Sequence, residues 1–217
     1  MNQLRGIGMT SASTRARMVE RLRERGIRDE RVLTAMAAVP RHVFVDEALA
    51  SRAYDDTALP LGFQQTISQP FVVARMIELA RAGRELGRTL EVGAGCGYQA
   101  AVLAQLAVEV FAVERIGTLL AKARTNLRQM RLSNVRLKHG DGNLGLAEAA
   151  PFDTIIVAAA ALSVPLPLLE QLAPGGRMIL PFGAAEQRLH VIERRRSDYA
   201  QTRCDPVRFV PLVAGTE

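Results

Sequence analysis

Apolar side chains in the first part of the chain recur at helical spacing. Met18, Val19 and Leu22 lie within one such stretch, and Gly26 follows it in the position of a helix C-cap. A helix is therefore predicted over 14–25.

Two more helices are predicted before residue 82. Asp29 is suited to cap a helix that continues to residue 39, where Pro40 would stop it. A further helix is expected over 71–81. Residues 54–70 contain two prolines and a glycine and have no helical periodicity, so we expect a loop-rich segment there.

From residue 89 onward, apolar runs of strand length alternate with helical stretches. Helices are predicted from Tyr98, over 116–130 and up to Leu172. Strands are predicted at TLEVG (89–93), VEVFAVE (108–114), VRLKHGD (135–141), FDTIIVA (152–158), RMILPFG (177–183) and LHVIERR (189–195). This alternation predicts an α/β fold with a mostly parallel sheet covered on both faces. The last two strands are expected near 188–195 and 206–213, one of them antiparallel at the sheet edge, and the pattern leaves the strand order open.

A glycine-rich loop follows the strand at 89–93 and reads LEVGAGCGY over 90–98. Gly93, Gly95 and Gly97 allow positive φ and let the backbone approach a ligand, next to the unpaired N–H groups of the following helix. The third glycine comes one residue too early for a G-x-G-x-x-G dinucleotide motif, and no G-K-[ST] follows. The loop alone is compatible with nucleotide binding or with an ordinary strand–helix turn.

Acidic residues end the next two predicted strands. Glu114 comes 21 residues after Gly93, where an acid can accept hydrogen bonds from two ribose hydroxyls, and Asp141-Gly142 is placed to reach an adenine amino group. Glu114 is also suited to cap the next helix, and Asp141 to form a turn. Together with the glycine loop, these acids make three candidate ligand-binding groups at the carboxyl ends of successive strands. This pattern is that of an S-adenosylmethionine-dependent methyltransferase.

Short motifs extend the pattern over nearly the whole chain. They are VPR (39–41), FV (44–45), LP (59–60), QTISQP (65–70), VER (113–115), HGDG (139–142), PFD (151–153), PGGR (174–177), LPFG (180–183) and RFVPLV (208–213). With the glycine loop, they make the chain resemble the protein-L-isoaspartate O-methyltransferases. The Thr-Ile-Ser segment is the specific part, because other methyltransferases share the glycine loop without it.

The resemblance implies a Rossmann-like, S-adenosylmethionine-dependent methyltransferase fold with a mostly parallel central sheet, helices on both faces and an N-terminal helical extension. It implies one domain over 1–217, in which 1–82 supply N-terminal helices and a substrate loop and 88–217 the cofactor-binding core. The implied reaction moves a methyl group from S-adenosyl-L-methionine to the free α-carboxylate of L-isoaspartyl residues in damaged proteins. The ester then forms a succinimide without the enzyme, and hydrolysis returns some normal aspartate.

The resemblance also implies the site residues. Ser68 would be the active-site residue, while Glu114 would bind the ribose and Asp141-Gly142 the adenine. The implied cofactor contacts are Thr66, Ile67, Gly93, Gly95, Gly97, Glu114, Asp141 and Gly142. Ser68 also has an alternative interpretation as the cap of the helix that begins near Pro70.

Two segments depart from the family pattern. Residues 158–162 read AAAAL where the family usually has a proline after its alanine pair, in a loop expected to line the substrate entrance. Cys96 stands where serine is common. We expect it to pack as a small residue, with a regulatory thiol as the alternative.

The implied chemistry requires no general base. A free α-carboxyl group has a pKa of roughly 3.5, so the acceptor is ionised at neutral pH. This agrees with His42, His139 and His190, which form no evident catalytic set. Ser68 would orient the acceptor as a hydrogen-bond donor, and rate acceleration would come from positioning and desolvation.

The composition is that of an ordinary globular protein, with 48% hydrophobic and 23% charged residues. The uncharged stretch 154–169 is too short to span a membrane and contains two prolines, and MNQLRGIGMT has no apolar run typical of a signal peptide. The two cysteines have no zinc-ligand spacing. We expect a cytoplasmic protein without metal or membrane contact, a monomer that acts on isoaspartyl proteins and peptides.

The net charge of +6 comes almost entirely from arginine. Acids interrupt the arginine-rich segment 15–31, which favours a solvated helix face over a specific nucleic-acid site. A nucleic-acid methyltransferase stays an alternative, but alanines replace the [DN]-P-P-[YF] motif of base N-methyltransferases, and neither cysteine fits an RNA cytosine methyltransferase. A non-catalytic RNA-binding module would tolerate a degraded glycine loop, whereas this loop is intact.

Overall fold

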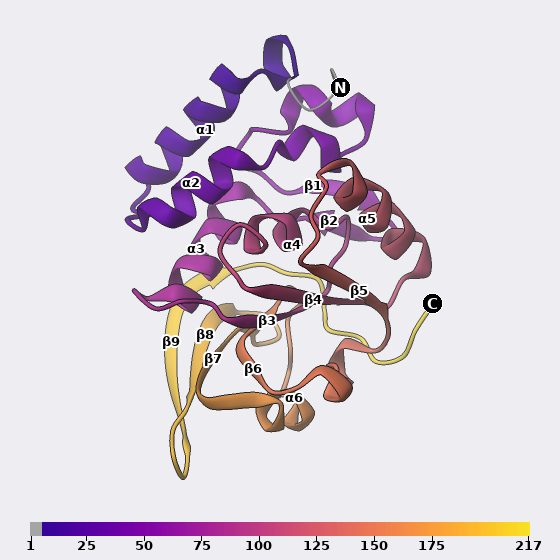
Figure 1. The fold of residues 1–217 in the computed structure, drawn as a ribbon. Helices are drawn as coiled ribbons and strands as arrows, with labels where there is room; N and C mark the ends of the chain where they lie inside the picture. The colour runs from indigo at the N-terminus through magenta and orange to yellow at the C-terminus, as the bar shows by residue number, and fades with distance from the viewer. Residues whose placement is uncertain (1–5) are drawn as a thin grey trace.

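A seven-stranded sheet forms the centre of the computed structural model, which describes residues 6–217 (Figure 1). Residues 1–5, which belong to the expectations about a signal peptide and the 1–82 segment, lie outside the described residues. The strand order is β5-β4-β3-β6-β7-β8-β9. The strands are β3 (Arg88–Val92), β4 (Glu109–Glu114), β5 (Val135–His139), β6 (Phe152–Val157), β7 (Leu172–Phe182), β8 (Gln187–Arg194) and β9 (Tyr199–Val207).

The pairing directions confirm the predicted α/β class. The pairs β3–β4, β3–β6, β4–β5 and β6–β7 are parallel. The pairs β7–β8 and β8–β9 are antiparallel, so β8 runs against the other strands of this sheet and lies second from the edge.

The predicted strand over 206–213 is wrong. The chain turns back at once after β8, so that the polar, mostly exposed segment Tyr199–Val207 pairs with β8 as the edge strand. An edge strand needs no continuous apolar pattern, because one side of it faces solvent. The apolar RFVPLV segment lies beyond this strand and crosses toward the carboxyl ends of the parallel strands (Figure 1).

Helices cover both faces of the sheet, as predicted. The α-helices are α1 (Ala12–Glu24), α2 (Glu30–Ala38), α3 (Pro70–Arg81), α4 (Tyr98–Leu103), α5 (Gly117–Gln129) and α6 (Leu166–Glu170). Short 3-10 turns occur at Gly8–Thr10, Arg41–Phe44, Glu47–Arg52, Gly142–Leu144 and Ala147–Ala149. Alternate strand residues pack on opposite sides: Val110 and Ala112 join the core beneath α4 and α5, whereas Val113 joins the core that contains Leu168 of α6.

The N-terminal helices form the predicted extension. Met18 and Leu22 of α1 are buried in the same hydrophobic core as the residues of α4. Asp29 caps α2 as expected, because its side chain accepts hydrogen bonds from the N–H groups of Arg31 and Val32 at 3.0 and 3.3 Å. Among the described residues, no helix is both long and apolar enough to cross a membrane.

The segment 54–70 is more ordered than the expected loop. It forms an antiparallel hairpin of β1 (Leu59–Gly62) and β2 (Gln65–Ile67). Phe63 and Gln64 join the two strands with φ values of 53° and 57°. Positive φ at both central residues is typical of a hairpin turn, which glycine or asparagine normally forms, so the composition gave no signal for it.

The predicted helix up to Leu172 is also wrong at its end. Helix α6 ends at Glu170, and Leu172 pairs with Phe152 as the first residue of β7. The Gln171 side chain marks this change by accepting a hydrogen bond from the Leu146 N–H at 2.7 Å and donating one to the Leu144 carbonyl at 2.8 Å.

Candidate active site

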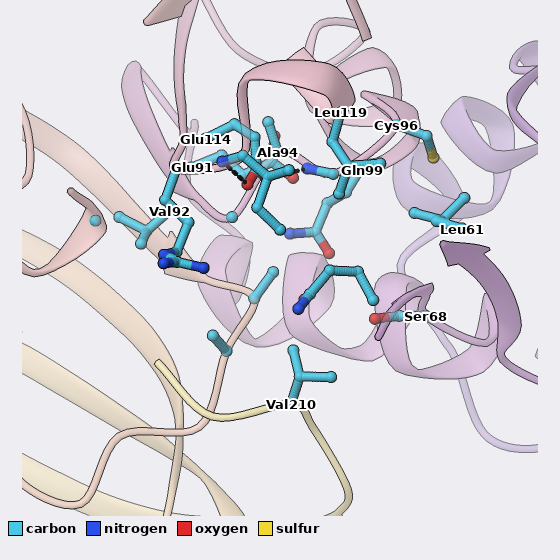
Figure 2. A pocket seen from close by; sticks show the side chains of 18 of the residues that line it. Leu61, Ser68, Glu91, Val92, Ala94, Cys96, Gln99, Glu114, Leu119 and Val210 are labelled. Atoms are coloured by element: carbon cyan, nitrogen blue, oxygen red, sulfur yellow. Dashed lines mark hydrogen bonds between the residues drawn. The ribbon is translucent and has the colours of Figure 1, made fainter. Parts of the chain in front are cut away.

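A cavity with a volume of about 880 Å³, which includes its open mouth, lies at the carboxyl ends of β3 and β4, and we call it the first cavity. Its walls come from the β1–β2 hairpin, the glycine loop, the end of β4 and the C-terminal segment. Figure 2 shows Glu91, Ala94 and Glu114 on one side of it and Ser68 and Val210 on the other. The predicted site residues that line this cavity are Thr66, Ile67, Ser68, Gly93, Gly95, Glu114 and Gly142.

The glycine loop has the backbone conformation that its sequence predicts. Gly93, Gly95 and Gly97 have φ values of 89°, 53° and 86°, which side chains other than hydrogen rarely allow. A Cβ atom on Gly97 would also lie 3.2 Å from the Leu127 side chain. Gly97 is the N-cap of α4 and is not among the residues that line the first cavity, so glycine is required there for its conformation and for close packing.

Glu114 connects the end of β4 to the glycine loop. Its Oε2 accepts a hydrogen bond from the Gly95 N–H at 2.8 Å, and its Oε1 accepts one from the Ile116 N–H at 2.9 Å. Helix α5 begins at Gly117 with Ile116 as its N-cap and without a side-chain cap, so the capping alternative for Glu114 is wrong. Glu114 is 5% exposed and lines the first cavity, and its carboxylate has lone pairs beyond those that accept these two hydrogen bonds.

Asp141 forms the turn that its alternative interpretation predicts. Its Oδ1 accepts a hydrogen bond from the Asn143 N–H at 2.8 Å, and its Oδ2 accepts one from the Gly215 N–H at 2.7 Å. Burial alone would raise the pKa of Asp141, but these hydrogen bonds hold that pKa below its ordinary value. Gly142 lines the cavity beside it, and a Cβ there would lie 2.4 Å from the Val92 side chain.

Ser68 does not cap helix α3. The N-cap of this helix is Gln69, which makes no side-chain cap hydrogen bond. The Phe71 N–H in the first turn is instead bonded to Asp56 Oδ1 at 2.9 Å. The capping alternative is therefore wrong, and the Ser68 side chain lies at the wall of the first cavity.

Sequence reasoning missed a buried acid in this wall. Glu91 on β3 lines the first cavity with no exposed surface, and neither carboxylate oxygen has a hydrogen-bond partner in the described part of the chain. Gln99 on α4 lines the same cavity, and its Nε2 is buried without a partner as well. Burial raises the pKa of Glu91 well above its ordinary value, the neighbouring Glu114 raises it further, and Gln99 opposes the shift. An acid at an interior strand position directly before the glycine loop was the available signal.

The C-terminal segment closes the cavity from the side opposite the glycine loop. Val210 and Leu212 line the first cavity and are held in place by Ala160, whose N–H bonds the Val210 carbonyl at 2.8 Å and whose carbonyl accepts from Leu212 N–H at 2.8 Å. Ala158 also lines the first cavity. It belongs to the loop 158–162, which was expected to line the substrate entrance.

A second cavity adjoins the first, with a volume of about 1250 Å³ that includes its open mouth. The two share Thr66, Ser68, Ala158 and Val210 as lining residues. The remaining walls come from residues 57–58, from the start of α3 and from residues 206–209.

Cys96 has the properties of a packing residue. Its side chain is buried, and burial raises the pKa of the thiol to about 11. A thiol that stays protonated at neutral pH is a poor nucleophile, which favours the packing interpretation.

Among the described residues, no group of three or more His, Cys, Asp or Glu side chains could hold a metal ion.

The three histidines lie in separate environments. His42 Nδ1 lies 2.8 Å from the Tyr54 hydroxyl, His139 Nε2 lies 2.9 Å from the Arg115 carbonyl, and His190 contacts Gln201. None of the three lines either cavity.

Comparisons with known proteins show which family the sequence resembles. The family model described as Protein-L-isoaspartate(D-aspartate) O-methyltransferase matches residues 13–217. The chain is 71% identical over 215 residues to Protein-L-isoaspartate O-methyltransferase of Dechloromonas aromatica, covering 99% of this chain and 100% of that protein. It is 69% identical over 210 residues to the protein of the same name from Aromatoleum aromaticum, covering 97% and 96%.

Two solved structures are similar along most of this chain. One, described as a protein-L-isoaspartate O-methyltransferase, superposes with a TM-score of 0.82 at 27% identity over 91% of this chain, which spans 65% of that longer chain. The other is a putative protein-L-isoaspartate O-methyltransferase from Plasmodium falciparum in complex with S-adenosyl-L-homocysteine, with a TM-score of 0.79 at 26% identity, covering 92% and 98%. The chain described here belongs to the protein-L-isoaspartate O-methyltransferase family.

Proposed function

We propose that the chain methylates the free α-carboxylate of L-isoaspartyl residues with S-adenosyl-L-methionine as donor, the donor lying in the first cavity and the acceptor in the second. The observation that carries this proposal is the place of Ser68, whose side chain lines both cavities. The similarity to the S-adenosyl-L-homocysteine complex from Plasmodium falciparum supports a nucleoside ligand in the first cavity.

The first cavity suits this donor in charge and shape. Glu91 is a buried carboxylate without a partner among the described residues, which fits a ligand that brings a positive charge and N–H donors of its own. Glu114 lies beside Gly95 with free lone pairs, which fits ribose hydroxyls. Gly142 lines this cavity, and we assign the adenine to the 141–142 turn.

The chain's own residues position the reactants. S-adenosylmethionine, when bound, supplies an electrophilic methyl group on a sulfonium sulfur. The acceptor carboxylate carries no proton at neutral pH, so we assign no residue to proton removal. Ser68 donates a hydrogen bond that orients the acceptor, while Ile67 and Val210 exclude water around it.

Substitution of Ser68 tests this proposal. For Ser68→Ala we expect kcat/KM toward an isoaspartyl peptide to fall by about 10- to 1000-fold, because a misaligned acceptor raises the barrier to transfer. Donor affinity should stay close to that of the wild type. The exposed Ser133, outside both cavities, provides the matched control Ser133→Ala. Turnover near that of the control in a folded, donor-bound Ser68→Ala protein would remove Ser68 from the reaction.

We further propose that the protein acts as a cytoplasmic monomer whose residues 1–82 and 88–217 work as one domain, without a specific nucleic-acid partner. The shared hydrophobic core of the N-terminal helices and α4 supports the single domain. The ion pairs within the arginine-rich α1 region, such as Arg23 with Glu20 and Glu30, support a solvated surface over an anion-binding one.

A further inference from the structure

The two cavities differ in formal charge. Glu91 and Glu114 lie in the wall of the first cavity, together with Arg115, which is held by Glu217 and the Gly215 carbonyl. Arg208 is the one charged residue among the described residues that line the second cavity. The acids therefore face the first cavity and an unopposed cation faces the second.

The Arg208 guanidinium is available for a ligand. The residue is exposed, and none of the ion pairs within residues 6–217 includes it. The nearest acid along the chain, Asp205, is paired with Arg75 at 2.9 Å. A free arginine in a pocket that is otherwise uncharged is suited to hold the non-attacking oxygen of a carboxylate through a charge-assisted hydrogen bond.

The backbone on both sides of Arg208 is fixed. Val207 ends β9 and pairs with Gln187 of β8. The Gln187 side chain then holds Phe209 by accepting from its N–H at 2.6 Å and donating to its carbonyl at 3.2 Å. The Cα of Arg208 therefore has a defined position at the wall of the second cavity.

We infer that Arg208 is a specificity-determining residue that binds the acceptor through its carboxylate and so selects anionic acceptors over their neutral amides. The inference rests on the proposed function and deepens it by assigning a residue to the acceptor side. Methylation converts the bound carboxylate into a neutral ester, which removes the attraction to Arg208. The same side chain therefore favours capture of the substrate and release of the product.

Arg208 lies outside the first cavity, which is consistent with a role in acceptor binding. A cation in direct contact with the attacking oxygen would stabilise its negative charge and slow its attack on a sulfonium methyl group. Arg208 lines only the second cavity, whereas Ser68 lines both. Arg208 therefore acts chiefly on acceptor affinity, and Ser68 on alignment.

The test compares Arg208→Gln with Arg196→Gln, which removes the same charge from an exposed residue between β8 and β9 and outside both cavities. For Arg208→Gln we expect kcat/KM toward an isoaspartyl peptide to fall by about 5- to 50-fold, mainly through a higher KM. Arg208→Lys should recover part of this loss, because lysine keeps the charge without the planar fork.

A binding measurement supplies the second readout. Calorimetry with S-adenosylhomocysteine present compares an isoaspartyl peptide with its α-carboxamide analogue. We expect the wild type and Arg196→Gln to prefer the carboxylate, and Arg208→Gln to lose most of that preference. Equal behaviour of Arg208→Gln and Arg196→Gln, a lower kcat at unchanged KM, or an equal loss of affinity for both peptides would overturn the assignment. Failure of the wild type to methylate the peptide would instead overturn the proposed function.

Discussion

Glu114 stabilises the conformation of the site and keeps carboxylate lone pairs that can accept hydrogen bonds from a ligand. Its two oxygens bind the N–H groups of Gly95 and Ile116, so the carboxylate fixes the glycine loop before any ligand arrives. For Glu114→Gln we expect S-adenosylmethionine binding to weaken by about 1–3 kcal/mol, because a charged acceptor becomes a neutral one. Calorimetry measures this change. Glu109→Gln, at the opposite end of β4, is the control, and equal affinities of the two variants would refute the ribose assignment.

Glu91 links ligand binding to stability through its raised pKa. Because burial raises this pKa, the unfolded chain loses the proton at a lower pH than the folded one, and the unliganded fold loses stability as pH rises from about 4.3 toward the folded pKa. Glu91→Gln removes this loss. We expect a higher melting temperature than wild type near neutral pH, a difference that shrinks toward about pH 4, and weaker donor binding. Thermal melts across pH without ligand would contradict the account if the two curves stayed parallel.

At the scale of elements, Asp56 connects the segment before the β1–β2 hairpin to helix α3. Its Oδ1 accepts from the Phe71 N–H at 2.9 Å, and its other oxygen pairs with Arg25. For Asp56→Ala we expect the free energy of unfolding to fall by about 1 kcal/mol, as for a lost helix cap. The exposed neighbour Asp55 gives the control Asp55→Ala.

Urea denaturation should give Ser68→Ala a free energy of unfolding within about 0.5 kcal/mol of the wild-type value. A loss as large as that of Asp56→Ala would restore a structural role for Ser68.

The elements also show what a single sequence can predict. Regular hydrophobic spacing correctly indicated the N-terminal helices, the five parallel strands and the helices between them. The β1–β2 hairpin escaped prediction because its turn residues, Phe63 and Gln64, are not typical turn formers. Strand β9 escaped because an exposed edge strand has no apolar pattern, while the apolar 208–213 segment serves as a cavity wall.

The site residues, too, were predictable only in part. Residues at the ends of strands, such as Gly93 and Glu114, were predictable because parallel strands bring their carboxyl ends to one edge. The sequence marked Glu91 only by its place before the glycine loop and did not mark Arg208, because the roles that we propose for them depend on which charges lack a partner after folding. That information exists only in the three-dimensional arrangement.

At the scale of the whole molecule, the proposed site has acids on the donor side and a cation on the acceptor side, with Ser68 between them. The division predicts an enzyme that recognises a carboxylate by its position and not by charge alone, since aspartyl and isoaspartyl residues carry the same charge. The net charge of +6 gives at most a weak, salt-sensitive attraction to RNA.

The most direct measurement incubates the protein with methyl-labelled S-adenosylmethionine and an isoaspartyl peptide, its normal aspartyl twin or RNA. We predict that label enters the isoaspartyl peptide alone and is released by mild base, as expected of a carboxyl methyl ester. Equal labelling of the aspartyl twin, or labelling of RNA without the peptide, would contradict it.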